Sequence, residues 1–242
     1  MAQLPDWQPL DGGVAVPDGR GAGRVIAVVA SEKAVASGWA GTAALDLARA
    51  WSRGGEKVIL ADGALNNPTL HQLAQLENVE GLSDAALFGA SVGKVARPVN
   101  GESFFLITAG TAVADANKVP GSPRWERLVE GFKEAGVKLL LFVRDGDSGC
   151  RTFVSSATDI VVLADRGEHA PGAVRGREQL VRAMTGPGVA GGSDARPPVE
   201  WTAEEPEGKR RVVLIAIAAV VFVALLVFAY MSIDFGALVP TP

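Results

Sequence analysis

A long uncharged run near the C-terminus constrains this chain most strongly. No charged residue occurs between Val212 and Met231, and the basic triplet Lys209-Arg210-Arg211 stands directly before that run. A helix rises about 1.5 Å per residue, so the run reaches roughly 30 Å, the thickness of the hydrocarbon core of a bilayer. A buried core helix is the alternative, but such helices rarely extend this far without a polar face. The sequence therefore predicts one transmembrane helix, with the lipid bilayer as a partner.

The charges on either side of the run predict its orientation. Lysine and arginine beside a span tend to remain on the cytoplasmic side, and the far side carries Asp234 and no basic residue. We therefore expect a single-pass protein of the cytoplasmic (inner) membrane, with its N-terminal domain in the cytoplasm. The segment from Met1 to Arg24 lacks the apolar core of a secretory signal peptide.

The residues before this run alternate between two patterns. Short apolar segments at 24–30, 57–61, 103–108, 137–143 and 159–164 are typical of strands that are buried on both faces. Segments with helical spacing lie between them, at 42–53, 67–73, 82–89 and 123–134. Strands that alternate with helices predict an α/β fold, in which helices flank a mostly parallel sheet.

These patterns divide the chain into consecutive parts. We expect a flexible N-terminal arm (1–23), the α/β domain (24–165), a linker that is partly helical at 175–184 and then flexible (166–208), the transmembrane helix with its basic flank (209–233) and a short external tail (234–242). The boundaries follow the points where the apolar periodicity ends and Gly, Pro and acidic residues become frequent.

Composition excludes two classes of function. The formal net charge is −4, which gives no basic surface for nucleic acid, so we expect no nucleic-acid partner. The two histidines, His71 and His169, and the single cysteine, Cys150, stand too far apart to give a metal-ligand spacing. The sequence therefore predicts no metal site of its own.

The order of motifs resembles that of a known family. The stretches TAALDLARAWSRGGEKVILAD (42–62), GALNNPTLHQL (63–73) and EGLSDAALFGAS (80–91) are similar to the MinD/ParA group of P-loop ATPases. The similarity is closest to the cytoplasmic domains of bacterial tyrosine kinases of polysaccharide biosynthesis and export, and it extends over about residues 24–165. It implies a P-loop NTPase-like fold, whose members use ATP and Mg²⁺.

The loop after the first strand departs from this family where nucleotide is held. The resemblance places Ala40 at the phosphate-binding lysine and Gly41 at the hydroxyl that binds Mg²⁺. Trp39 stands at a glycine position, so it either fills the nucleotide site or contributes to a partner surface. Lys33 corresponds loosely to the family's other lysine, and Thr42 is the nearest hydroxyl.

The carboxylates of the family are also incomplete. Asp62 corresponds to the first of two paired aspartates, and Ala64 stands at the second. Arg144 occupies the position of the aspartate that organises the water shell of the metal, and Asp145 is displaced by one residue. Because successive residues of a strand point to opposite faces, such a shift can turn the carboxylate away. Asp62 has an alternative interpretation, in which it caps the turn after its strand.

Two functional hypotheses follow. The first is a membrane-anchored, catalytically inactive ATPase-like regulator or scaffold without a cofactor, which docks on a protein partner or a second copy and is linked to polysaccharide biosynthesis or export. The second is an active ATPase or nucleotide switch that uses ATP and Mg²⁺ through Lys33, Thr42, Asp62 and Asp145. Neither includes tyrosine autophosphorylation, because the one tyrosine, Tyr230, lies inside the predicted span.

Overall fold

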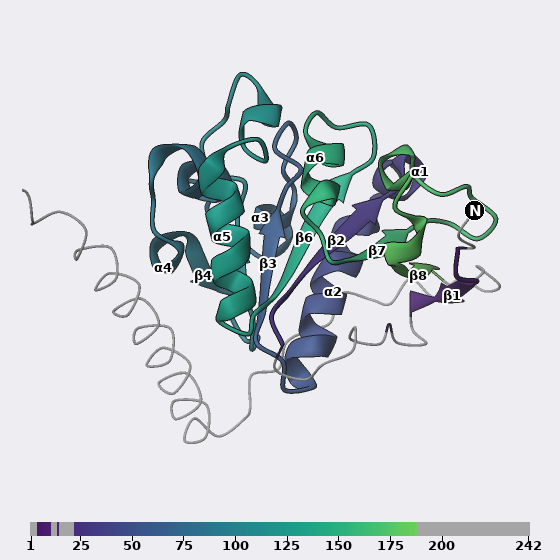
Figure 1. Ribbon diagram of the computed structural model, residues 1–242. Helices are drawn as coiled ribbons and strands as arrows, with labels where there is room; N and C mark the ends of the chain where they lie inside the picture. The colour runs from purple at the N-terminus through teal and green to yellow at the C-terminus, as the bar shows by residue number, and fades with distance from the viewer. Residues whose placement is uncertain (1–3, 11–13, 15–21, 188–242) are drawn as a thin grey trace, which may run out of the picture. The chain divides into compact units, whose positions relative to one another are not determined.

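The computed structural model describes residues 4–10, 14 and 22–187, which contain one sheet of eight strands (Figure 1). The order across the sheet is β1-β8-β7-β2-β6-β3-β5-β4, and all neighbours are parallel except β4 and β5. The strands are β1 (Trp7–Pro9), β2 (Arg24–Ala30), β3 (Val58–Asp62), β4 (Ala96–Pro98), β5 (Phe105–Ile107), β6 (Lys138–Arg144), β7 (Asp159–Leu163) and β8 (Val181–Gly186).

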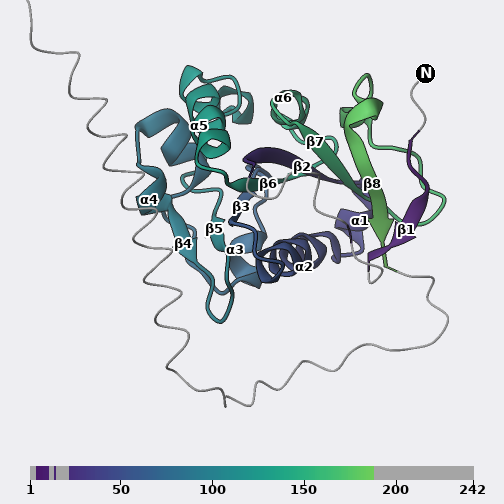
Figure 2. The same ribbon diagram turned by 60° about the horizontal axis from the view of Figure 1, so that its bottom comes forward.

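Helices cover both faces of this sheet, as Figure 2 shows. The residues of α1, α2 and α3 pack on one face, and those of α5, α6 and the π-helical turn η2 pack on the other. The helical elements are α1 (Glu32–Ala36), α2 (Ala40–Arg53), α3 (Leu70–Leu73), η2 (Asp84–Phe88), α4 (Val92–Val95), η3 (Ala116–Lys118), α5 (Pro123–Glu134), α6 (Cys150–Ser155), η4 (Gly172–Val174) and η5 (Glu178–Leu180).

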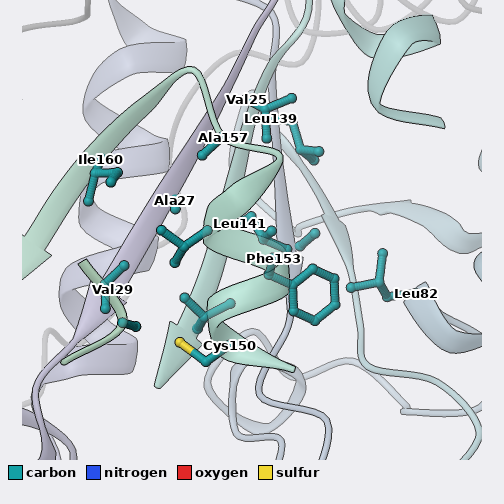
Figure 3. Packing of buried hydrophobic residues seen from close by; sticks show 14 of the residues in the cluster. Val25, Ala27, Val29, Leu82, Leu139, Leu141, Cys150, Phe153, Ala157 and Ile160 are labelled. Atoms are coloured by element: carbon teal, nitrogen blue, oxygen red, sulfur yellow. The ribbon is translucent and has the colours of Figure 1, made fainter. Parts of the chain in front are cut away.

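Alternate residues of the central strands enter two separate cores. In β2, Val25 and Ala27 belong to the core beneath α5 and α6, whereas Ile26 and Val28 belong to the core beneath α2. Figure 3 shows Val25 and Ala27 in the first core together with Phe153 of α6. Both faces of β2 are therefore shielded from water, which explains why its sequence is continuously apolar rather than alternating.

The structure confirms the α/β part of the predicted fold class. The five predicted strands are present, with ends within two residues of those expected, and α5 has the predicted bounds. The sheet also extends beyond the predicted domain of residues 24–165, because β8 follows it in sequence and β1 lies in the expected N-terminal arm. These two strands pair with each other and form one edge of the sheet.

Of the helix predicted at 175–184, only the short 3₁₀ helix η5 (Glu178–Leu180) is present. The last four residues of the predicted helix belong to β8, in which Val181 and Met184 enter the core beneath α5 and α6 while Ala183 enters the other core. A short apolar segment cannot be assigned to helix or strand by periodicity alone. Pairing with β7, which the local sequence does not show, decides the outcome here.

The transmembrane helix stays a prediction. Within the part of the chain that the structure describes, no helix is both long and apolar enough to cross a membrane. The predicted span from Val212 to Met231 lies outside the described residues, as do the linker after residue 187 and the tail.

A buried carboxylate joins the amino ends of three strands. Asp159, at the start of β7, is fully buried, and its oxygens lie 3.0 Å from Nη1 of Arg24 in β2 and 2.6 Å from Nε of Arg182 in β8. Thr158 also donates its hydroxyl to this carboxylate. Burial opposes ionisation, but the hydrogen bonds from Arg182, Thr158 and Arg24 outweigh it and hold the pKa of Asp159 below its usual range.

We expect Asp159→Asn to lower the free energy of unfolding by about 2 kcal/mol, because two arginines lose a charged acceptor in a buried position. A carboxyl whose pKa is lowered in the folded state adds stability above its ordinary pKa and loses it as the pH falls through the folded value. Urea unfolding between pH 3 and pH 7 should therefore show a smaller acid loss in the variant. Glu130→Gln, which removes an exposed ion pair with Lys133, is the control and should change stability by less than about 0.5 kcal/mol.

Candidate functional site at the carboxyl edge of the sheet

The two central strands of the sheet send their connections in opposite directions. From β2 the chain passes through α2 to β3, which lies beyond β6, and from β6 it passes through α6 to β7, on the other side of β2. The carboxyl ends of β2 and β6 therefore form a topological switch point. In doubly wound sheets, ligands bind in the crevice at such a point.

The loop that leaves β2 is folded as a short helix. Ser31 caps α1, and its Oγ accepts a hydrogen bond from the N–H of Ala34 at 3.1 Å. The N–H groups of Val35, Ser37 and Gly38 donate to carbonyls of the same loop. A loop that binds phosphate needs N–H groups that point at the ligand, and these four are already engaged.

The first residues of α2 are enclosed rather than open. Ala40 and Gly41, at the family's lysine and Mg²⁺ positions, are both buried. A Cβ on Gly41 would lie 2.7 Å from Cδ1 of Leu73, so α3 covers this end of α2. Lys33 and Thr42, the two residues proposed as substitutes, are exposed.

Trp39, between α1 and α2, is half-buried against the core beneath α2. Its ring extends toward the end of β8, since a Cβ on Gly186 would lie 3.3 Å from Cη2 of the indole. The indole Nε1 is buried and has no hydrogen-bond partner among the described residues. Trp39 thus reaches across β7 to β8, whereas Asp62 stands at the end of β3 on the other side of β2.

Asp62 holds the turn that follows β3. Its fully buried carboxylate accepts backbone N–H groups from Ala64 at 3.1 Å, Thr69 at 3.2 Å and Leu70 at 3.1 Å. Thr69 makes no side-chain cap at the start of α3, so Asp62 supplies the cap from the preceding strand. Burial raises the pKa of Asp62 to about 6, against the opposing effect of the three N–H donors and of the charge on Arg144.

The residues that end β6 turn toward different neighbours. Arg144 donates from Nη1 to the carbonyl of Asn67 at 3.1 Å, in the loop after β3. The carboxylate of Asp145 accepts the N–H groups of Gly172 at 2.7 Å and Ala173 at 2.8 Å, after β7. A cation therefore stands where the family has a carboxylate, and the displaced carboxylate serves another segment.

A second carboxylate bond holds the chain that leaves β7. Oε2 of Glu168 accepts the hydroxyl of Ser31 at 2.8 Å and the N–H of Asp165 at 2.9 Å. The segment Asp165–Val174, which we call the crossover segment, is thus attached to the loop after β2 and to the end of β6. No local pattern in the sequence indicates these contacts, because Ser31 and Glu168 are far apart in the chain.

The four residues predicted to contact nucleotide lie at this edge but do not form one cluster. Asp62 and Asp145 accept backbone N–H groups from separate segments, and Lys33 and Thr42 are exposed. None of these four side chains, all within the described residues, forms a hydrogen bond or ion pair with another.

Asp84, at the start of η2, is a structural residue of this edge. Oδ2 accepts the N–H groups of Gly81 at 2.8 Å and Thr111 at 2.9 Å, and Oδ1 accepts the Thr111 hydroxyl at 2.6 Å. Burial opposes ionisation of Asp84, but the bonds from Thr111 and Gly81 outweigh it and lower its pKa. Gly81 itself is required, since a Cβ there would lie 2.0 Å from the carbonyl oxygen of Thr108.

Comparison with solved structures identifies this architecture. The kinase domain of Escherichia coli tyrosine kinase ETK matches with a TM-score of 0.60 and 16% identity over 76% of this chain and 73% of that chain. The chimerical protein CapA2B2 matches with a TM-score of 0.57 and 18% identity over 69% of this chain and 76% of that chain. The sequence matches no protein-family model and no curated protein.

One further comparison corrects a prediction. The septum site-determining protein MinD from Pyrococcus horikoshii, complexed with Mg-ADP, matches with a TM-score of 0.47 and 17% identity over 57% of this chain and 56% of that chain. The expectation that this chain uses no cofactor is contradicted by the comparisons, since the matched structures include the kinase domain of ETK as well as a complex with Mg-ADP.

In the described conformation, the carboxyl edge of the sheet does not offer the usual contacts for a Mg-nucleotide complex. Gly41 has no hydroxyl for Mg²⁺ and is covered by Leu73, Asp62 is engaged by backbone N–H groups, and Arg144 places a cation at a metal position. We therefore derive no catalytic step through Mg-nucleotide from these residues. Because the sequence identities are low, the comparisons establish the fold alone, which is P-loop NTPase-like. The sequence resemblance to MinD/ParA ATPases and bacterial tyrosine kinases implies the same fold.

The raised pKa of Asp62 predicts a pH dependence of stability. A carboxyl with a raised folded pKa favours the folded state below its ordinary pKa, and this contribution is lost as the pH rises through about 6. Between pH 4 and pH 7 the ionisation of Asp62 should lower the free energy of unfolding by up to about 3 kcal/mol. The Asp62→Asn variant should not show this fall. Urea unfolding at several pH values measures both. Asp46→Asn, at an exposed position of α2, is the control; equal pH profiles for the wild type and Asp62→Asn would contradict the prediction.

Proposed function

We propose that this chain is a membrane-anchored, catalytically inactive regulator or scaffold built on a P-loop NTPase-like fold. One observation carries the proposal: the carboxylates at the switch point are bound by the chain itself. Asp62, Asp145 and Glu168 each accept backbone N–H groups, and four N–H groups of the loop after β2 donate within that loop. The proposal concerns catalysis and leaves nucleotide occupancy to be measured separately.

The chemistry of phosphoryl transfer supports this proposal. Such reactions depend on preorganised cations and a metal that neutralise charge in the transition state. Removing one such group typically lowers the rate on the order of a hundredfold or more. This chain has Ala40 in place of the lysine, Gly41 in place of the hydroxyl and Arg144 in place of a carboxylate. Losses at several positions leave little hydrolysis to expect.

The second candidate is a nucleotide switch with a non-standard loop. Lys33 and Thr42 are exposed beside the switch point, so both are available to a ligand that approaches from solvent. The Mg-ADP complex of MinD among the matched structures is consistent with a nucleotide as that ligand. In this second candidate, hydrolysis of ATP or exchange of the bound nucleotide changes the state of the protein. The scaffold of the first candidate needs neither.

Phosphate release by the full chain in liposomes separates the two candidates. With ATP and Mg²⁺ we expect no hydrolysis above that of protein-free liposomes, while a fluorescent ATP analogue reports binding in the same samples. Mg²⁺-dependent hydrolysis that falls at least about tenfold in Lys33→Ala, but not in Lys118→Ala, would favour the active ATPase. Lys118 is exposed on η3 and serves as the matched control.

The remaining parts of the proposal are the anchor and the partner. The run from Val212 to Met231 would hold the chain in the cytoplasmic membrane, with the α/β domain in the cytoplasm. The partner would be another protein or a second copy, and the net charge of −4 argues against nucleic acid. A link to polysaccharide biosynthesis or export rests on the resemblance to the tyrosine kinases of that process.

Alkaline extraction of membranes that contain the full chain tests the anchor. High pH strips proteins that are held by charge, whereas a transmembrane helix keeps its protein in the pellet. We expect the chain to remain in the pellet at pH 11 and to be released by detergent. Its appearance in the alkaline supernatant would contradict a membrane span.

A further inference from the structure

We propose that the crossover segment (165–174) is a strap across the carboxyl ends of β2 and β6 that opens as a unit, with Asp145 and Glu168 as its two latches. This goes beyond the proposed function, because it concerns access to the switch point whatever happens there. Three features of the segment support this proposal: its path across the ends of the strands, the few hydrogen bonds that hold it, and the buried core into which its end packs.

The path of the strap is fixed by bonds at its two ends. Near its start, Glu168 is bound to Ser31, the residue directly after β2. Near its end, the N–H groups of Gly172 and Ala173 are bound by Asp145, the residue directly after β6. Because β7, β2 and β6 are consecutive neighbours in the sheet, the chain that leaves β7 crosses the ends of both other strands before it returns to β8.

Few other bonds hold the strap in place. The backbone hydrogen bonds of residues 165–174 that the structure describes are local, such as the bond from the N–H of Glu168 to the carbonyl of Asp165. Arg166, Gly167 and His169 are exposed, and Gly167 has a φ of +83°, which lets the chain turn there.

The other attachments of the strap are the buried side chains of Pro171, Ala173 and Val174, and the guanidinium of Arg166, which lies 6.0 Å from the centre of the Trp7 ring. Because the segment has no strand ladder and a solvated middle, the loss of either carboxylate bond lowers the free energy of its opening.

The end of the strap packs into the core that holds the single cysteine of the chain. Ala173 and Val174 belong to the same core as Cys150, which begins α6 and is 3% exposed. Figure 3 shows the Cys150 thiol among the apolar side chains of this core. Burial raises the pKa of the Cys150 thiol to about 12, and the charges of Asp145 and Asp147 add to that effect. Cys150 is therefore unreactive while this core is closed, and the rate at which a thiol reagent modifies it reports opening.

The experiment measures modification of Cys150 in the full chain, in detergent micelles under native conditions, together with hydrogen exchange at the N–H groups of Gly172 and Ala173. We expect Glu168→Gln and Asp145→Asn each to raise both rates by about tenfold, the effect of one lost charge-assisted hydrogen bond. The urea midpoint of each variant is measured in parallel, so that local opening is distinguished from a loss of global stability.

Asp147→Asn is the matched control for charge. It removes the same charge beside Cys150, but Oδ2 of Asp147 has no hydrogen-bond partner among the described residues and the side chain does not hold the strap. Asp145→Asn should therefore exceed Asp147→Asn by about tenfold in thiol modification. Equal rates in these two variants, together with wild-type rates in Glu168→Gln, would overturn the proposal. So would rates that follow only the urea midpoint, because the segment would then open with the whole domain.

Discussion

Backbone N–H groups at the carboxyl edge of a parallel sheet need acceptors, and in this chain its own carboxylates supply them. Asp62 binds the loop that leads into α3, Asp84 binds the segment after β5, and Asp145 binds the segment after β7. Each carboxylate lies where a strand or turn ends, and each accepts an N–H group from a distant residue, at least eight positions away in the chain. The loops of this edge are therefore fixed relative to the sheet without a ligand.

The same chemistry has a different arrangement at the opposite edge. There Asp159 accepts from the arginines of two neighbouring strands, so the amino ends of β2, β7 and β8 are joined by ion pairs rather than by backbone donors. At Asp159 the donors outweigh the cost of burying the charge, whereas at Asp62 the cost of burial prevails over three backbone donors. The pKa of Asp159 is therefore lowered, because its carboxylate faces two guanidinium groups, and the pKa of Asp62 is raised, because its carboxylate faces mainly backbone amides inside the protein.

Much of the fold could be predicted because its signals are local. The run at β2 is apolar at every position, and α5 begins with a capping serine and proline, so both elements are marked by their own residues. The strand β8 could not be predicted in this way, because its alternation is short and its partner β7 is separated from it by the crossover segment. At the edge of the sheet, the roles of Asp145 and Glu168 depend on contacts between distant parts of the chain, which no local pattern shows.

The proposed scaffold function rests on an edge of the sheet whose carboxylates are bound by the chain itself. The most direct test is hydrogen exchange, followed by NMR, at the N–H groups of Ala64, Leu70, Gly172 and Ala173 in the full chain without added nucleotide. The account predicts exchange at least about a hundredfold slower than in an unfolded chain at all four positions. Exchange at the unfolded rate at Leu70 and Gly172 would contradict it, because the carboxylates of Asp62 and Asp145 would then be free to meet a ligand.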